Sequence, residues 1–426
     1  MKQLKITYNN NFFKTIIVII IMLVSDDTLL FGTNINTNFV IMKYIVLILL
    51  FIILSLKSLL QNKKLCLYSS DIVCLILCSL VLLSGFINGD LRSGYFYKCL
   101  IITLSYLVVK TMSFEEFAKK FEQLFFVLAL ISTICTIIAE VRLSIFSIFP
   151  VFYNSVNTSF YNLGVYLVPT SISLLRNYGV FREPGVYQMF LVMALLFHLY
   201  YDDLKVSHVL VYIIAIVLTF STTGYLALVV FLILFFIKKS NFLKENRKKI
   251  LIFFLITIGI IYLFTQTDLL SSSGMIFDKF SNTKRTTTIA RTSSIFVNLK
   301  IWEKNPLFGA GLVGIDRMFP QLTYLLYGKA ITHNTNTLLC ELATYGVFYT
   351  FILVNGYIKL SNLFTNNKIE RILILLIIFI LSCGEKLTFS PIIYILLFYG
   401  ILFNKIKCKT QNYDKQVISK KMEVEI

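Results

Sequence analysis

The stretch IMKYIVLILLFIILSLKSLL, residues 41–60, decides the fold class of this chain. It is almost entirely apolar, and its two charged residues, Lys43 and Lys57, lie near its ends. A helix that crosses a membrane needs about 20 mostly apolar residues in a row. The stretch therefore predicts a transmembrane helix.

The composition of the whole chain agrees with this prediction. Of the 426 residues, 57% are hydrophobic and 15% are charged, whereas soluble domains are about 45–50% apolar and about 25% charged. A disordered chain is excluded as well, because such chains are poor in apolar and aromatic residues. The net charge of +18 would suggest a nucleic-acid partner in a soluble protein. In a chain this apolar it indicates basic loops that orient a membrane protein, and we expect no nucleic-acid partner.

Apolar runs predict an all-α, polytopic membrane protein with about 12 transmembrane helices. The first run is interrupted by Asp26 and Asp27. The run 160–175 contains Pro169 and polar residues, so we interpret it as an interfacial or re-entrant piece of a loop; if it spanned, the later topology would invert. The expected spans are 12–31, 39–60, 67–87, 95–112, 121–140, 185–201, 207–222, 223–238, 250–266, 336–358, 371–383 and 390–405.

Basic residues predict the orientation of these spans. The block KKSNFLKENRKK at 238–249 is the strongest cytoplasmic marker, because Lys and Arg accumulate in cytoplasmic loops. It places both termini in the cytoplasm, including a tail at 406–426. The single membrane domain, 1–426, then has two long extracytoplasmic loops, 141–184 and 267–335.

Several enzyme classes are excluded by missing motifs. The chain contains neither a phosphate-cradling GxxxxGK[ST] sequence nor a zinc-binding HExxH sequence. Every cytoplasmic loop is also too short to fold as a nucleotide-sugar domain. Any chemistry must therefore come from residues of the spans and outer loops.

One outer histidine stands in the sequence HNTNT. His198 and His208 fall at the inner ends of their spans, and we interpret both as ordinary interfacial residues. A helix beginning near His333 would place His333, Thr337 and Glu341 on one face. The alternative is that HNTNT only caps the helix. An acid inside an apolar span is costly, and so Glu341 is a functional candidate.

A second candidate is FREPG, residues 181–185. Pro184 suits the first position of a helix, and the residue before a proline is held extended. Arg182 and Glu183 would then lie at the outer end of the sixth span, where a helix N-terminus beside an arginine can bind an anion. The alternative is a weak surface ion pair between the two side chains.

The third candidate is the segment 283–314 of the second long loop. Arg285 and Arg291 precede the sequence NPLFGAG, whose glycines permit a tight turn and close backbone approach. Arginines can clamp a phosphate with paired donors. The alternative for this basic loop is attraction to anionic lipid headgroups.

These three segments, in this order on a chain with about twelve spans, resemble the O-antigen polymerase and O-antigen ligase superfamily. The matching words are FREPGVYQ (181–188), two arginines followed by W…NPLFGAGL (285–312), and HNTNTLLCELATYG (333–346). The superfamily consists of integral-membrane glycosyltransferases with a GT-C-like fold. The resemblance implies a bacterial cytoplasmic (inner) membrane protein.

The resemblance also implies the chemistry. The donor would be an oligosaccharide carried on a polyprenyl diphosphate. It would be transferred at the outer face of the cytoplasmic membrane, without a metal or another cofactor. Other expected partners are membrane lipid and a chain-length regulator protein. The implied donor-binding residues are Arg182, Arg285 and Arg291, with Asn334 as a glycan contact. The implied catalytic residues are His333 and Glu183, and Glu341 is added from the helical-face argument alone.

Three functions remain open from the sequence. We favour a polymerase of O-antigen or capsular polysaccharide, which lengthens a lipid-linked chain by repeat units. A ligase, which transfers finished polymer to lipid A core, would share the donor chemistry. A non-enzymatic flippase would instead need charged residues along a path through the spans, where few occur.

Overall fold

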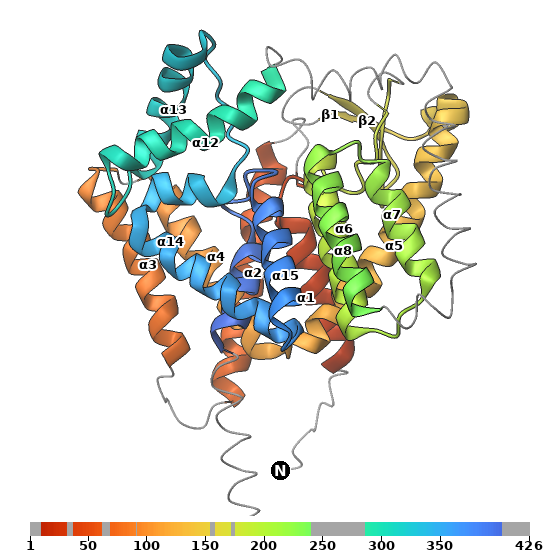
Figure 1. The fold of residues 1–426 in the computed structure, drawn as a ribbon, viewed down its shortest axis with the longest axis horizontal. Helices are drawn as coiled ribbons and strands as arrows, with labels where there is room; N and C mark the ends of the chain where they lie inside the picture. Colours follow the sequence, from red (N-terminus) through yellow and green to blue (C-terminus); the bar gives the residue numbers. More distant parts are fainter. Residues whose placement is uncertain are drawn as a thin grey trace, which may run out of the picture.

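The computed structural model of the chain describes residues 10–31, 37–61, 69–90, 92–153, 158–171, 175–239 and 286–402. The expected span 250–266, the expected site residue Arg285 and the tail 406–426 lie outside these ranges. The described chain is mostly helical (Figure 1).

Every expected span except 250–266 coincides with a helix, so the prediction of a mainly helical protein is confirmed. The helices are α1 (Asn10–Val24), α2 (Thr37–Gln61), α3 (Ser69–Ile87), α4 (Ser93–Thr111), α5 (Phe114–Arg142), the 3₁₀ helix η1 (Leu143–Ile148), α6 (Pro184–Tyr201), α7 (Val206–Val217), α8 (Thr222–Lys238), α12 (Thr286–Lys304), α13 (Gly311–Tyr327), α14 (Thr337–Phe364) and α15 (Lys368–Ser382). A last described helix spans Pro391–Leu402.

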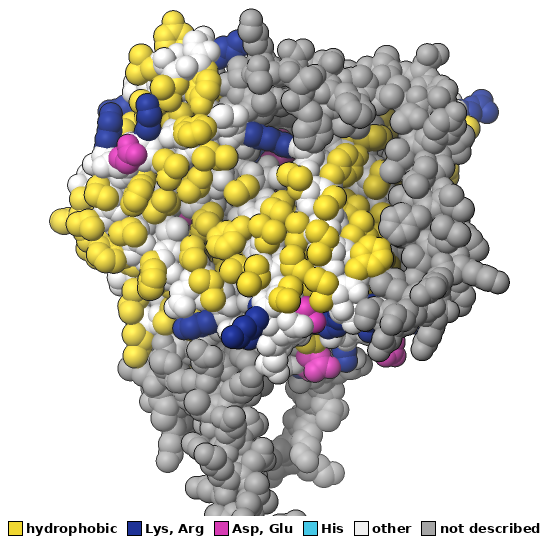
Figure 2. Space-filling view, viewed as in Figure 1, with side chains coloured by type: hydrophobic (Ala, Val, Ile, Leu, Met, Phe, Trp, Pro, Cys, Tyr) yellow, Lys and Arg dark blue, Asp and Glu magenta, His cyan; other side chains and the backbone are white. Residues whose placement is uncertain are grey.

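Five of the described helical segments are long and apolar enough to cross a membrane. They are Ile41–Leu59, Ser70–Ile87, Phe114–Ile148, Pro184–Tyr201 and Thr337–Phe364. Figure 2 shows a belt of hydrophobic side chains with charged side chains toward its two ends, as a bilayer requires. The chain is therefore a multi-pass membrane protein, whereas the number of twelve spans stays a prediction.

Helix α6 forms the centre of one half of the bundle. Its apolar window is 89% buried, against 17% for α2, so α6 is enclosed by protein and α2 faces outward. Its neighbours are α5, α7 and α8. The helices α12 and α13 and the strands of the first long loop lie at the same end of the bundle (Figure 1). This is the end at which α6 begins.

The first long loop contains a small sheet that the all-α prediction missed. Strands β1 (Val151–Tyr153), β2 (Ser159–Asn162) and β3 (Leu167–Pro169) pair antiparallel in the order β1-β2-β3. The run 160–175 thus begins as two strands and a turn rather than as a spanning helix. Helix formation fails here because polar residues and Pro169 interrupt the apolar run.

The expected first span, 12–31, is too long. Helix α1 ends at Val24, and the two acids that follow it lie beyond the helix. The side chains of Asp26 and Asp27 form ion pairs with Arg182, a residue far along the chain. A carboxylate inside an apolar span would be costly, and ending the helix first avoids that cost.

Helix α14 is broken at Gly346, which has φ +82° and ψ −175°. The turn that includes NPLFGAG replaces the helical hydrogen bonds there: Val347 N–H donates to Pro306 O (3.0 Å), and Ala310 N–H donates to Ala343 O (2.8 Å). A Cβ atom on Gly346 would lie 2.1 Å from Leu307 O. The predicted close backbone approach is therefore confirmed.

A buried ion pair ties α4 to α14. Lys98 Nζ lies 2.6 Å from Glu341 Oε1, and both side chains are fully buried. Lys98 also donates to the carbonyl of Thr388, and the Tyr394 hydroxyl donates to Glu341 Oε1 at 3.0 Å. Such pairing lowers the cost of placing both charges among apolar helices.

This pair yields a prediction about stability. Lys98→Met should leave an uncompensated buried carboxylate and cost about 3–5 kcal/mol of stability, because the lost partner no longer offsets its desolvation. The double variant Lys98→Met/Glu341→Leu should recover most of that loss. Thermal unfolding of the detergent-purified protein measures both effects. A single variant as stable as the parent would contradict the prediction.

Candidate active site

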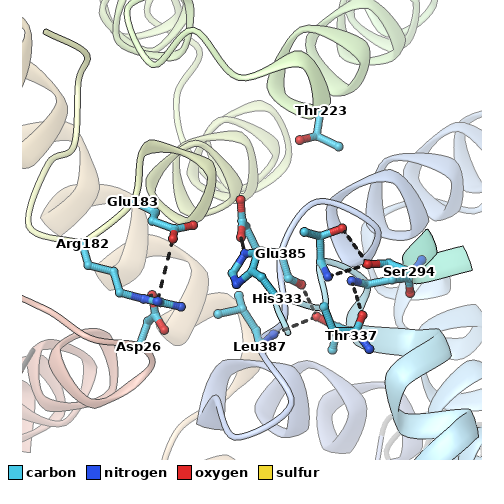
Figure 3. A network of polar contacts seen from close by, with 12 residues as sticks. Asp26, Arg182, Glu183, Thr223, Ser294, His333, Thr337, Glu385 and Leu387 are labelled. Carbon is cyan, nitrogen blue, oxygen red and sulfur yellow. Dashed lines mark hydrogen bonds and ion pairs between the residues drawn. The ribbon is translucent and has the colours of Figure 1, made fainter. Parts of the chain in front are cut away.

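Three side chains from distant segments converge at the end of the bundle where α6 begins (Figure 3). Glu183 precedes α6, His333 lies between α13 and α14, and Glu385 follows α15. Their nitrogen and carboxylate oxygen atoms lie within 4.8 Å of one another. His333 Nε2 is 4.0 Å from Glu385 Oε2. Glu385 was not among the residues expected from sequence.

Local backbone preferences place Glu183 in this cluster. Its backbone is extended, with φ −136° and ψ 137°, and Pro184 begins α6, as the sequence predicts. The next residue, Gly185, makes room for the second acid. A Cβ atom on Gly185 would lie 2.1 Å from Glu385 Oε1, so any larger residue would displace that carboxylate.

Helix α14 begins at Thr337, four residues after His333. Asn336 caps it by accepting a hydrogen bond from Leu339 N–H at 2.9 Å. The expected common face of His333, Thr337 and Glu341 is therefore wrong, because His333 is not helical. Glu341 lies in the buried pair with Lys98 and not in the cluster.

The rest of HNTNT anchors the segment that carries His333. The side-chain amides of Asn334 and Asn298 on α12 exchange two hydrogen bonds, at 3.0 and 3.2 Å. Thr335 N–H donates to Ser294 Oγ at 2.9 Å, also on α12. Asn334 is only 3% exposed. Its amide thus holds the loop against α12, which differs from the glycan contact expected from sequence.

Thr337 connects this segment to the loop that carries Glu385. Its hydroxyl donates to Glu385 O at 2.5 Å and accepts from Leu387 N–H at 2.9 Å. The backbone of Glu385 is therefore positioned by the first residue of α14. Figure 3 shows this contact beside His333. Helix capping therefore accounts only for Asn336 of HNTNT. Asn334, Thr335 and Thr337 make the contacts with α12 and with the loop of Glu385 described above.

The electrostatics of the cluster favour a neutral imidazole. Burial raises the pKa of Glu385 well above its usual value, and the neighbouring Glu183 raises it further. Partial burial lowers the pKa of His333; Glu183 opposes this effect, while Arg182 and Lys386 reinforce it. The His333 side chain is 49% exposed. It can therefore accept a proton from a molecule bound at this end of the bundle.

Arg182 forms ion pairs with three acids and not only with its sequence neighbour Glu183. Its guanidinium lies 3.4 Å from Asp26, 3.7 Å from Asp27 and 3.8 Å from Glu183. Burial raises the pKa of Asp26 to about 6, although Arg182 opposes that shift. The two aspartates after α1 were visible in the sequence only as an interruption of an apolar run. Only the fold brings them next to Arg182.

Arg291 lies on α12 and faces the start of α8. Its guanidinium donates to the hydroxyl of Thr222. Within the described ranges, no carboxylate lies at ion-pair distance from it. Its sequence neighbour in the expected site, Arg285, is outside the described residues.

A second cluster of histidines and acids lies at the opposite end of α6. His198 Nδ1 and His208 Nδ1 each lie 3.2 Å from Glu122 Oε1. Lys205 N–H donates to His198 Nε2 at 3.2 Å, so Nε2 carries the lone pair and Nδ1 carries the proton. A metal ion at Nδ1 would need the reverse arrangement. This cluster therefore fits a polar contact among α5, α6 and α7.

The candidate cluster at the start of α6 contains ligand types that a divalent cation accepts. Glu183, His333 and Glu385 together offer one imidazole and two carboxylates. Arg182 and Arg291 already bring positive charge to this end of the molecule. The metal independence implied by the resemblance stays a prediction.

Residues 208–354 match the family model described as O-antigen ligase. The matched region includes most of α7, all of α8, α12 and α13, His333 and the break in α14. It ends before Glu385 and begins after Glu183. A search of curated proteins finds no match for the chain.

The pKa of His333 can be tested without knowledge of the reaction. Only neutral imidazole reacts with diethyl pyrocarbonate, so labelling of His333 should rise with pH with a midpoint below 6.5, its ordinary pKa. Lys386→Ala should move the midpoint upward, because that lysine disfavours the imidazolium. Glu183→Gln should move it downward. Mass spectrometry measures the labelling, with fully buried His198 as the internal control. A midpoint above 6.5 would contradict the prediction.

Proposed function

Because residues 208–354 match the O-antigen ligase family model, whose members are glycosyltransferase-like enzymes, we propose that the chain is a polysaccharide repeat-unit polymerase of the O-antigen ligase and polymerase superfamily. It transfers a glycan chain from a polyprenyl diphosphate to a hydroxyl of an incoming lipid-linked repeat unit. The observation that carries the proposal is the cluster of Glu183, His333 and Glu385 beside two arginines. The product is an O-antigen or capsular polysaccharide.

The geometry supports a direct transfer. The acceptor hydroxyl oxygen attacks the anomeric carbon of the donor sugar, and the bond from that carbon to the diphosphate oxygen breaks. His333 takes the hydroxyl proton, since its lowered pKa leaves it neutral at neutral pH. Glu183 stabilises the imidazolium that forms, since its charge favours the protonated ring, and Glu385, 4.0 Å from Nε2, orients the ring. The polyprenyl diphosphate leaves with the bonding electrons.

Arginines near the cluster stabilise the leaving group. Negative charge develops on the diphosphate as the bond breaks, and preorganised cationic donors lower the barrier to that step. In this proposal Arg182, Arg285 and Arg291 serve the donor, and the reaction needs no metal. Arg182 is also held in place by Asp26 and Asp27, which favours a fixed geometry during turnover.

The orientation of the protein follows from the chemistry. The cluster lies at the end of the bundle near α12, α13 and the small sheet, and the basic sequence that follows α8 predicts that the opposite end is cytoplasmic. We place the protein in the bacterial inner membrane with both termini in the cytoplasm. Donor and acceptor then meet at the outer face. A chain-length regulator is a further proposed partner.

The ligase is the second candidate, and the description of the matching family favours it. It would use the same cluster and donor, with a lipid A core sugar as acceptor. A non-enzymatic flippase fits less well. The charged pair inside the bundle, Lys98 and Glu341, is closed by direct contact instead of lining a path.

Polysaccharide ladders test the proposal. Deleting the gene should leave surface polysaccharide one repeat long, because no chain would be extended. A deletion strain complemented with Arg182→Ala, Arg291→Ala or His333→Ala, at matched protein levels, should stay close to that state. A normal ladder after deletion would refute the polymerase. Long polymer retained on the polyprenyl carrier would identify the ligase instead.

A glycine substitution tests the role of Glu385. Gly185→Ala should push the Glu385 carboxylate away from His333, and a displacement of about 1 Å can cost about 100-fold in rate. The matched control is Gly94→Ala at the start of α4, where the new Cβ would meet only the tip of the Leu312 side chain. Transfer by membranes with lipid-linked substrate is the readout. Equal rates in both variants would exclude Glu385 from the mechanism.

A further inference from the structure

A polar cavity lies where the turn between α3 and α4 meets the start of α13. Its volume is about 450 Å³, which falls within the ~300–1,000 Å³ that is usual for small-molecule sites. Its polar lining consists of Asn88, Asp90, Asn305 and Arg317. These residues are separate from the cluster of glutamates and histidine described above, and none of them was expected from a motif.

The wall that Asp90 contributes is held by hydrogen bonds. Its Oδ2 accepts from the hydroxyl of Tyr95 and from Val313 N–H, both at 2.9 Å, and its Oδ1 accepts from Arg92 N–H at 3.2 Å. Asp90 is only 6% exposed. Burial raises the pKa of this carboxyl, but the hydrogen bonds outweigh burial and lower the pKa below its usual value. The cavity therefore has an ionised carboxylate in a fixed position.

The other polar side chains of the lining have unused hydrogen-bonding atoms. Asn88 Nδ2 donates to two backbone carbonyls, at 2.8 and 3.1 Å, and among the described residues no donor reaches its Oδ1. Asn305 Nδ2 has one long contact, 3.4 Å to a carbonyl of α12, and its Oδ1 has no donor in the same ranges. The exposed guanidinium of Arg317 has neither a hydrogen bond nor an ion pair within the described part of the chain.

This set of groups suits the hydroxyls of a sugar. A hydroxyl can donate to a carboxylate or amide oxygen and can accept from a guanidinium. A phosphate is disfavoured, because Asp90 is a buried carboxylate and the free atoms of the two amides include acceptors that a phosphate cannot satisfy. A metal cation is disfavoured by Arg317 and by Arg92, whose Nε lies 3.3 Å from Asp90 Oδ1.

Helix α12 relates the cavity to the catalytic cluster. Asn298 holds the segment that carries His333, and Asn305 follows the last residue of the helix. From Asn298 to Asn305 the rise of a helix is about 10 Å. Arg291, assigned above to the donor, lies on the other side of Asn298 along the same helix. A glycan whose reacting hydroxyl meets His333 would therefore extend away from the donor and toward the cavity.

We propose that the cavity between the α3–α4 turn and α13 binds a neutral sugar of the acceptor repeat unit, with Asn305 and Arg317 as its specificity-determining contacts. The proposal rests on the function proposed above and names the part of the site that binds the acceptor. Asn88 and Asp90 form the fixed wall against which the sugar hydroxyls are placed. A site built to hydrogen-bond hydroxyls rejects analogues that lack them, because its own polar groups are then left unpaired.

Binding of a free oligosaccharide tests the cavity without the diphosphate. The probe is the repeat-unit oligosaccharide that mild acid releases from the lipid-linked intermediates of the strain, and the full-length protein is held in lipid nanodiscs. Arg317→Ala should weaken binding about tenfold, because a hydrogen bond from a charged donor is lost, and Asn305→Ala should weaken it about threefold. Both variants should unfold at the parent temperature.

Two matched controls lie next to the cavity without lining it. Lys304→Ala removes an exposed charge at the end of α12, and Gln321→Ala removes an exposed amide on α13. Both should bind the oligosaccharide as the parent does. Titration with inorganic phosphate is the control for the ligand. A phosphate affinity that falls in Arg317→Ala while oligosaccharide binding is unchanged would identify an anion site and overturn the proposal.

The remaining outcomes separate the cavity from the proposed reaction. Parent-like oligosaccharide binding by both Arg317→Ala and Asn305→Ala, or no measurable binding by the parent, would overturn the sugar site. Weakened binding by both variants, in a protein whose deletion leaves polysaccharide ladders intact, would overturn the polymerase and keep the site. Lost ladders after deletion, with parent-like binding by both variants, would keep the polymerase and overturn the site.

Discussion

The break in α14 at Gly346 is the constraint on which the half of the molecule with α12 and α13 depends. A helix that loses backbone hydrogen bonds inside a bilayer must find other partners, because each unsatisfied group costs several kcal/mol. The turn after α12 provides them through Pro306 and Ala310, and Ser84 Oγ donates to Thr344 O at 2.9 Å. These contacts join α3, α12 and α13 to α14. They also set the direction of the segment before the break, whose first residue, Thr337, holds the loop of Glu385.

Charges within this protein serve two different purposes. Lys98 and Glu341 neutralise each other in full burial, with Tyr394 completing the contact, so the pair connects helices and leaves little for a ligand. Arg291 instead contacts a hydroxyl oxygen, and no described carboxylate pairs with it. The difference lies in what surrounds each charge. A closed pair stabilises the fold, whereas an arginine without an acid suits a site whose substrate carries the negative charge.

Much of the fold could be predicted because its signals are local. Apolar runs of the right length marked the helices, Pro184 marked the start of α6, and the glycines of NPLFGAG marked a close backbone approach. The site was predicted only in part. His333, Glu183 and Arg182 were found from short motifs, but Glu385 stands in a loop without a motif. Asp26 could be seen only as an odd acid in an apolar run, since its partner is 156 residues away. The expected helical face shared by His333 and Glu341 was wrong because the start of α14 is set by the Asn336 cap, four residues later than that argument required.

The sequence by itself determined that this chain is a membrane protein, where its helices run, and which family it resembles. Hydropathy acts over about 20 residues, and proline and glycine act on their immediate neighbours, so these properties can be read along the chain. Only the tertiary structure decided which polar side chains meet. Glu183, His333 and Glu385 come together because the N-terminal ends of α6 and α14 lie at the same end of the bundle as the C-terminal end of α15. That packing depends on contacts between segments far apart in sequence, such as the turn of 306–310 against α14, and no local pattern encodes them.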